Sequence, residues 1–155
     1  PLSEVPESAY DKIMDTNVKS NLWLCNMVIP GMAERGGGAV IIVSSVAAFK
    51  GSAILGTYGL SKAADVALAR NLAVEWGHKN VRVNCLNPSI IRTDFARALW
   101  ENPEIYARAV ETYALGRIGE PEEVAGVAVM LAAKAGSFIT GQAIVVDGGS
   151  TIFAG

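Results

Sequence analysis

Ala39-Val40-Ile41-Ile42-Val43-Ser44-Ser45 is the stretch of sequence that decides the fold. Its central residues, 40–43, are all β-branched, which is typical of a strand covered on both faces of a sheet. A run of glycines at 36–38 comes directly before it and is suited to ending a preceding helix. The stretch therefore predicts a buried strand that ends in polar residues.

Helical and strand-like segments alternate along the rest of the chain. Apolar residues at helical spacing, or a proline and acids in a first turn, predict helices. Long helices are predicted at residues 6–34, 57–76 and 120–136, the first with a late kink or break at Pro30. One or two short helices, broken near Pro103, are predicted within residues 92–111. The other predicted strands cover residues 81–86 and 143–146. This order predicts an α/β fold in which helices cover the faces of a parallel sheet of about three strands.

The composition indicates a single domain with its own core. The chain has 155 residues, of which 51% are hydrophobic and 18% charged, and its net charge is −2. The basic residues are scattered, so nucleic acid is not expected as a partner. The longest nearly apolar run, residues 124–133, is too short to cross a bilayer, and the first residues lack the order of a secretory signal. We therefore expect no membrane association and a cytoplasmic location.

The two cysteines, Cys25 and Cys85, both lie in apolar segments. Their spacing does not match a metal site, and a cytosolic protein seldom keeps a disulfide. We predict two buried, reduced thiols and no metal centre.

Polar residues follow two of the predicted strands, in Ser44-Ser45 and Asn87-Pro88-Ser89. In an open parallel sheet, ligands bind beyond the carboxyl ends of the strands. Tyr58 and Lys62 are four residues apart on a predicted helix, so they share one face. A free tyrosine has a pKa of about 10, so it serves as a base at neutral pH only where a positive charge stabilises the phenolate. These residues predict a proton-transfer site, although the same spacing also occurs on the surface of amphipathic helices.

Together these segments resemble the carboxyl-terminal half of a short-chain dehydrogenase/reductase. The matching pieces cover nearly the whole chain and are Asp15-Thr16-Asn17-Val18, Val43-Ser44-Ser45, Tyr58 with Lys62, Val83-Asn84-Cys85-Leu86-Asn87-Pro88, and Gly141-Gln142 through Asp147-Gly148-Gly149. Residues 35–45 and Arg97-Ala98-Leu99-Trp100 are further similar to the carbonyl and retinal reductases of the family. The resemblance implies a Rossmann-like, doubly wound parallel sheet, of which residues 1–155 form the C-terminal catalytic half of a single domain.

One part of the family's pattern is absent from the sequence. Glycine-rich turns that join a strand to a helix hold the cofactor pyrophosphate, but residues 36–38 precede a strand and Gly148-Gly149 lie too near the end. The strand at residues 40–43 is so apolar that we expect it in the middle of a sheet. No earlier segment of the sequence can pair with its other side. We therefore expect the N-terminal dinucleotide-binding half to be absent from these residues.

The resemblance implies hydride transfer between NAD or NADP and a small carbonyl or alcohol substrate. Tyr58 would give or take the oxygen-bound proton, while Lys62 would stabilise the phenolate and hold the nicotinamide ribose. Ser45 would hydrogen-bond the substrate oxygen and is preferred to Ser44 by its 13-residue separation from Tyr58. Asn17 would hold a water that leads from Lys62 to solvent.

The loop after the strand at 81–86 is implied to contact the nicotinamide. Pro88 and Ser89 begin this loop, Ile91 would contact the amide through its backbone, and Thr93 would do so through its hydroxyl. The family usually has glycine at the position of Ser89, so a side chain stands where backbone approaches the cofactor. The residue that separates NAD from NADP follows a strand that this sequence does not contain.

Two alternatives to an enzyme stay open. Without half of its sheet, the chain is alternatively a non-catalytic fragment, an oligomerising α/β module that associates through its two long helices or its unpaired strand. A redox-independent α/β binding module is a further interpretation, but it leaves the spacing of Ser45, Tyr58 and Lys62 to chance. In the family the long helices form the main subunit interface, so a homo-oligomer, either a dimer or a tetramer, is expected.

Overall fold

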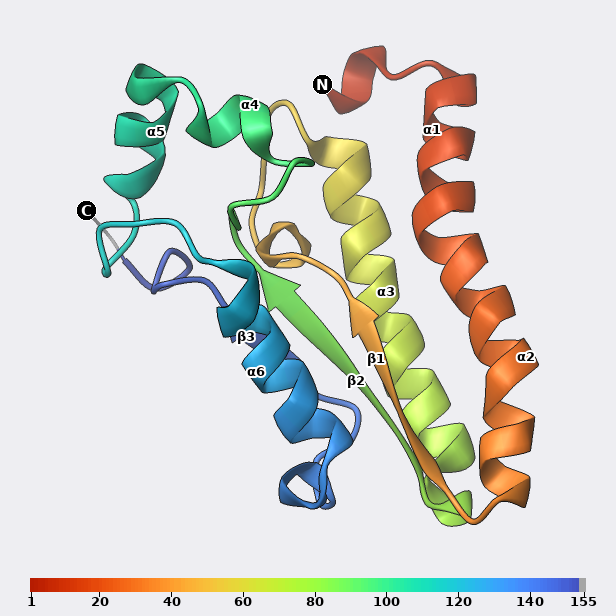
Figure 1. The fold of residues 1–155 in the computed structure, drawn as a ribbon. Helices are drawn as coiled ribbons and strands as arrows, with labels where there is room; N and C mark the ends of the chain where they lie inside the picture. The colour runs from red at the N-terminus through yellow and green to blue at the C-terminus, as the bar shows by residue number, and fades with distance from the viewer. Residues whose placement is uncertain (154–155) are drawn as a thin grey trace.

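The computed structural model describes residues 1–153 of the chain (Figure 1). The helices are α1 (Glu7–Met14), α2 (Ser20–Glu34), α3 (Gly56–Trp76), α4 (Arg97–Trp100), α5 (Pro103–Val110) and α6 (Pro121–Ala132). A π-helix at Asp15–Lys19 joins α1 to α2, and short 3-10 helices lie at Leu2–Glu4, Val46–Ala48, Gly77–Lys79 and Lys134–Gly136. The strands are β1 (Gly38–Val43), β2 (Val81–Pro88) and β3 (Ala143–Val146). Each predicted strand and long helix is confirmed.

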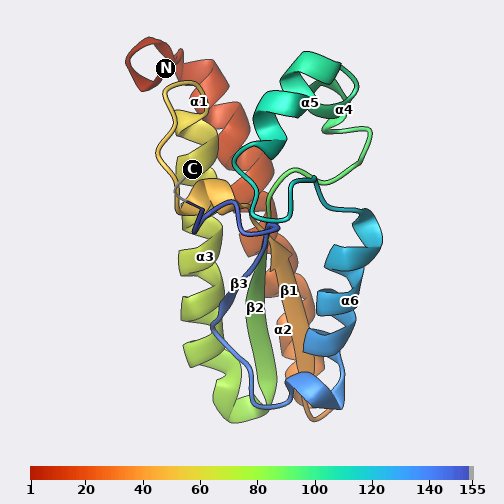
Figure 2. The same ribbon diagram turned by 90° about the vertical axis from the view of Figure 1, so that its left-hand side faces the viewer.

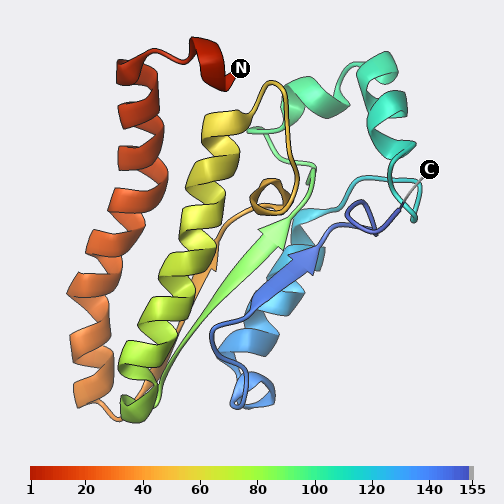
Figure 3. The ribbon, with the colours of Figure 1, turned by 180° about the vertical axis from the view of Figure 1, so that it is seen from behind.

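The three strands form one parallel sheet in the order β1-β2-β3. Gly38 pairs with Val81 at the start of the β1–β2 ladder, and Cys85 pairs with Ala143 where β3 joins. Helices α2 and α3 cover one face of the sheet and α6 covers the other, which gives three layers (Figures 2 and 3). The predicted α/β fold with a parallel sheet of three strands is confirmed.

The core lies between the sheet and helices α2 and α3. Val81, Val83 and Cys85 alternate along β2 on this face, and each has 0% of its surface exposed. Ile29 of α2 and Leu72 of α3 belong to the same buried cluster. A shift of β2 by one residue would turn these side chains to the opposite face, so their burial fixes the register of the central strand.

The glycine run ends α2 as predicted. The Gly37 amide donates to the Met32 carbonyl at 2.9 Å, and Gly37 has a φ of +133°, which residues with a side chain rarely adopt. A Cβ atom at Gly37 would also collide with the side chain of Asn80. Pro30 lies inside α2, which continues to Glu34, so the predicted break at this proline is not seen.

Two predicted boundaries differ from the structure. β2 extends past residue 86 to Pro88, because Asn87 and Pro88 pair with Val145 and Val146 of β3. Helix α6 ends at Ala132, short of the predicted residue 136, and a 3-10 turn follows. The chain turns back closely at Gly136, where a Cβ atom would meet the backbone of the last turn of α6.

β1 lies at an edge of the sheet. It pairs with β2 on one side, and no segment within residues 1–153 pairs with its other side. Val43 is 56% exposed at the end of this strand, although its sequence is typical of a central strand. None of the helices of residues 1–153 is long and apolar enough to cross a membrane.

Candidate functional site

The carboxyl ends of β1 and β2 lie at the same end of the sheet (Figure 1), and the predicted polar residues follow them in the sequence. Ser44 is buried, and its hydroxyl donates to the Lys62 carbonyl at 2.8 Å. Ser45 is half-buried, and its hydroxyl oxygen accepts from the Ala47 amide at 3.2 Å. The fold therefore uses the Ser44 proton, whereas the Ser45 hydroxyl keeps its proton for another partner. The choice of Ser45 over Ser44 as the substrate contact stays a prediction.

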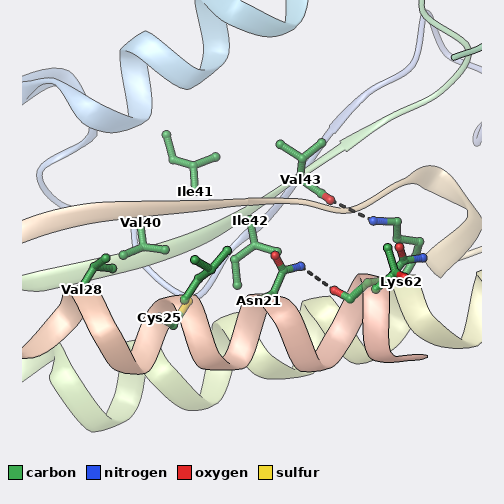
Figure 4. Close-up of a pocket in the computed structure, with 11 residues that line it drawn as sticks. Asn21, Cys25, Val28, Val40, Ile41, Ile42, Val43 and Lys62 are labelled. Carbon is green, nitrogen blue, oxygen red and sulfur yellow. Dashed lines mark hydrogen bonds between the residues drawn. The ribbon is translucent and has the colours of Figure 1, made fainter. Parts of the chain in front are cut away.

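Tyr58 and Lys62 lie in the first two turns of α3 and face the same side. The Lys62 ammonium nitrogen is 5.8 Å from the centroid of the Tyr58 ring. It also donates to the Val43 carbonyl at 3.1 Å, which holds it against the end of β1 (Figure 4). A positive charge is thus fixed close to the Tyr58 ring.

Asn17 lies in the π-helix between α1 and α2, a distortion that often marks functional sites. Its side-chain amide donates to the Ser61 hydroxyl at 2.9 Å, and that hydroxyl donates to the Tyr58 carbonyl at 2.8 Å. Its backbone carbonyl accepts from the Asn21 side chain at 2.7 Å (Figure 4). The structure thus ties Asn17 to the helical turn that carries Tyr58 and Lys62.

Asp65 and Asn21 are polar residues of this site that the sequence analysis missed. The Asp65 side chain has no exposed surface, and its carboxylate accepts from Lys62 Nζ at 3.2 Å and from Asn21 Nδ2 at 2.9 Å. The signal was present, because Asp65 comes three residues after Lys62 and interrupts a run of small apolar residues on α3.

Both cysteines are buried and free, as predicted. Burial, and next the negative charge of Asp65, raise the pKa of the Cys85 thiol to about 12. The same two causes raise the pKa of the Cys25 thiol. The Cys85 thiol donates to the Asp65 carbonyl at 3.3 Å. Neither thiol is suited to act as a nucleophile.

A cavity of about 390 Å³ opens along the free edge of β1, between this strand and α2 (Figure 4). Figure 4 shows Val40 and Ile42 turned toward α2, while Ile41 and Val43 are turned away from it. Lys62 lies at one end of the cavity, Val28 lies at the other, and Cys25 lies between them (Figure 4). The apolar edge of β1 and the polar site therefore share one open space.

The predicted nicotinamide loop begins where β2 ends at Pro88. The Ser89 amide donates to the Val146 carbonyl at 3.2 Å, and its hydroxyl is hydrogen-bonded to the Tyr113 hydroxyl and accepts from Ser150 Oγ at 3.3 Å. The side chain that replaces the family's glycine is thus held by residues of its own chain. Tyr113 and Ser150 are further residues that the sequence analysis missed, since they lie far from Ser89 along the chain.

Ile91 and Thr93 lie farther along this loop. Ile91 forms a bridge with Gly119, and the Thr93 hydroxyl is 3.4 Å from the Ile91 carbonyl. The Thr93 carbonyl accepts from the indole of Trp100 at 3.0 Å, which connects the loop to α4. The Arg92 guanidinium lies 5.2 Å from the Trp100 ring centroid. The loop and the short helices α4 and α5 therefore form one connected segment above the sheet edge (Figure 2).

One buried polar atom at this edge lacks a partner within residues 1–153. Asn87, the residue before Pro88, is completely buried, and its side-chain oxygen accepts no hydrogen bond. A buried acceptor without a donor is unfavourable.

Comparison with known proteins finds close relatives over almost the whole chain. A family model described as enoyl-(acyl carrier protein) reductase matches residues 1–151. The chain is 49% identical over 149 residues to the "Dehydrogenase/reductase SDR family member 4" of Bos taurus, a match that covers 96% of this chain and 53% of the relative.

Solved structures with the same fold agree with this result. A short-chain type dehydrogenase/reductase from Mycobacterium ulcerans superposes with a TM-score of 0.95 and 36% identity, over 100% of this chain and 56% of that one. A gluconate 5-dehydrogenase from Burkholderia cenocepacia, in complex with NADP and tartrate, has a TM-score of 0.93 and 27% identity, over 97% of this chain and 59% of that one. The chain thus spans about half the length of the curated relatives it matches.

Proposed function

Because the chain belongs to the short-chain dehydrogenase/reductase family, we propose that it carries the proton-transfer site of an oxidoreductase that moves a hydride between a nicotinamide cofactor and a small carbonyl or alcohol substrate. One observation carries the proposal. The Lys62 ammonium lies 5.8 Å from the Tyr58 ring, at the carboxyl end of β1, where α/β sheets bind their ligands. Ser45 and Asn17 lie in the segments that surround this pair.

The residues divide the proton chemistry among them. When bound, the nicotinamide would supply or accept the hydride at the substrate carbon. In the reduction, the Tyr58 hydroxyl gives its proton to the carbonyl oxygen, and the Ser45 hydroxyl donates a hydrogen bond to the same oxygen as negative charge develops there. The Lys62 ammonium stabilises the phenolate that remains. In the oxidation of an alcohol, Tyr58 takes the proton instead.

Asn17 serves the return of this proton to solvent. Its carbonyl oxygen accepts a hydrogen bond from Asn21, and Asn17 lines the same cavity as Lys62, which suits it to hold a water near Lys62. The amide side chain of Asn17, bonded to Ser61, keeps the π-helix against α3 and so keeps this carbonyl in place.

Residues at the end of β2 fit a nicotinamide. Pro88, Ser89, Ile91 and Thr93 form the loop that would hold the nicotinamide amide, and Tyr58 with Lys62 would hold its ribose. The Ser89 hydroxyl is engaged by Tyr113, so its side chain is directed to its own chain. The Burkholderia relative contains NADP, and both NAD and NADP are candidates for this chain.

We further propose that residues 1–155 are the C-terminal catalytic half of a Rossmann-fold domain and act together with a dinucleotide-binding half. The free edge of β1 supports this proposal, because a strand of four consecutive β-branched residues is suited to pairing on both sides. This chain joined to such an N-terminal half is termed the complete enzyme.

The test is oxidation of a reduced nicotinamide cofactor by the complete enzyme with carbonyl substrates. Tyr58→Phe removes only the hydroxyl and should lower kcat by about 10² to 10⁴, the usual contribution of a general acid. Tyr10→Phe, an exposed tyrosine on α1, is the matched control and should keep the activity. Unchanged activity of Tyr58→Phe would reject the proposed role.

A second candidate function is an oligomerising module without catalysis. It is favoured by large apolar side chains that are exposed on the long helices, among them Trp23 at 57%, Met27 at 76% and Val74 at 85%. The two candidates are compatible if a homo-oligomer of the enzyme uses these helices. Sedimentation of the 155-residue chain and its titration with reduced cofactor separate them, since self-association without saturable cofactor binding favours the module alone.

A further inference from the structure

Asp65 is a buried acid that the proposed mechanism does not use. Its side chain has 0% of its surface exposed, and each carboxylate oxygen accepts one hydrogen bond, Oδ2 from Lys62 and Oδ1 from Asn21. A buried carboxylate is unfavourable unless a positive charge and hydrogen-bond donors compensate it. Both forms of compensation are present here.

The position does not require an acid for packing. Neighbouring buried residues on α3, such as Val66 and Ala69, are apolar and belong to the core. Apolar residues in place of a buried ion pair are often neutral or stabilising. The ion pair of Lys62 and Asp65 is therefore poorly explained by stability.

The Asp65 carboxylate connects two of the predicted catalytic residues through protein atoms. Lys62 Nζ contacts Asp65 at 3.2 Å, and Asn21 Nδ2 contacts both Asp65 at 2.9 Å and the Asn17 carbonyl at 2.7 Å. Asn21 lies on α2 and Asp65 on α3, so the connection crosses between two helices. The charge of Asp65 is thus held at one fixed place relative to Lys62 and Asn17.

We propose that Asp65 is a positioning residue for the reaction, a fixed counter-charge that orients Lys62 and sets the pH range in which Tyr58 exchanges the substrate proton. This inference rests on the proposed function of Tyr58 and Lys62. It adds a residue that acts on the reaction through Lys62 and touches neither substrate nor cofactor.

The groups around Asp65 determine in which direction its charge shifts the pH dependence of the reaction. Lys62 is the basic group in contact with the Asp65 carboxylate, and the Tyr58 ring lies beyond Lys62. Cys25 of α2 and Cys85 of β2 face it as neutral thiols. A fixed negative charge favours the protonated form of each neighbour. Removal of this charge is therefore expected to move the pH dependence of the reaction to lower pH.

The test is the pH dependence of alcohol oxidation by the complete enzyme with Asp65→Asn, a change of nearly equal size. We expect the acid limb of the kcat profile to move to lower pH by roughly one unit. Asp11→Asn is the control, because it removes the same charge at an exposed position on α1. An Asp65→Asn profile with an unmoved limb would overturn the proposal, whatever the change in stability.

Two further experiments keep the proposal testable if Asp65→Asn does not fold. Asp65→Glu keeps the charge, so the acid limb of its kcat profile should stay where it is in the unsubstituted enzyme. If the limb of Asp65→Glu moves as far as that of Asp65→Asn, the charge of Asp65 has no such role. In the unsubstituted enzyme, the ¹³Cγ resonance of Asp65 should show a step at the pH where Lys62 loses its proton. If the resonance does not change over this pH range, the charges of Asp65 and Lys62 are not coupled, and the proposal is wrong. Failure of Tyr58→Phe to lower activity, by contrast, would reject the proposed function itself.

Discussion

Two regions of the molecule hold their polar side chains in opposite ways. Around Lys62, contacts of 2.7 to 3.2 Å join α2, α3 and β1 inside the protein, and the ion pair of Lys62 and Asp65 is 12% and 0% exposed. In the segment from Arg92 to Glu123, the ion pairs of Arg92 with Glu120 and of Arg117 with Glu123 have similar lengths, and their side chains are 41 to 47% exposed. Water screens the second group and hardly reaches the first. Equal distances therefore have unequal consequences for stability and chemistry.

The largest effect is expected from breaking the buried pair. Lys62→Met leaves the Asp65 carboxylate without its cation and should lower the free energy of unfolding by about 3 to 5 kcal/mol. Urea denaturation of the complete enzyme measures this change. Arg92→Met, which removes an exposed cation from its partner Glu120, is the control and should have a much smaller effect. Equal losses from the two substitutions would contradict the comparison.

A helix cap in the exposed segment should have an intermediate effect. Asn102 caps α5 by accepting from the amides of Glu104 and Ile105 at 2.9 and 3.3 Å. Asn102→Ala should lower the free energy of unfolding by about 1 kcal/mol, as is usual for such caps. Asn71→Ala, at an exposed position inside α3, is the control and should cost nothing. A loss at Asn102 as large as that of Lys62→Met would mean that the segment is not peripheral to stability.

The smallest effect should come from the capping box of α6 and should depend on pH. The hydrogen bond to the Arg117 guanidinium, and next the one from the Glu120 amide, lower the pKa of Glu123 from 4.5 to about 2. Because the folded value lies below the unfolded one, this contribution is present above pH 4.5 and is lost as the pH falls toward 2.

Melting temperatures of Glu123→Gln at about pH 7 and about pH 3 test this prediction. The variant should be less stable than the unsubstituted protein at neutral pH, and the difference should shrink at the acidic pH. Glu122→Gln in the same helical turn is the control, with no such difference expected. If the difference in melting temperature were the same at acidic and neutral pH, the contribution of Glu123 to stability would not depend on its charge.

The sequence was sufficient for the residues whose neighbours are close along the chain. Tyr58 and Lys62 are one helical turn apart, and the serines follow a strand whose β-branched residues are unmistakable. The parallel sheet followed from the alternation of strands and helices. The catalytic and cofactor-binding roles of the site residues stay predictions. The oligomeric state and the cytoplasmic location also stay predictions.

The missed features depend on contacts between distant segments. Asp65 follows Lys62 by three residues, but its burial and its hydrogen bond to Asn21, 44 residues earlier, depend on the packing of α3 against other elements. The partner of the Ser89 hydroxyl, Tyr113, lies 24 residues away. The π-helix at Asp15–Lys19 also left no trace in the apolar spacing, which is compatible with one continuous α-helix.

The most direct test of a catalytic role for this site is a variant that removes the buried pair as a whole, Lys62→Met with Asp65→Leu in the complete enzyme. If these residues serve chemistry, the double variant should regain most of the stability that Lys62→Met loses, because no unpaired charge stays buried. Its oxidation of reduced cofactor should stay as low as that of Lys62→Met alone. A double variant that is stable and retains the activity of the unsubstituted enzyme would contradict the central claim, that the polar site around Tyr58 and Lys62 carries the reaction.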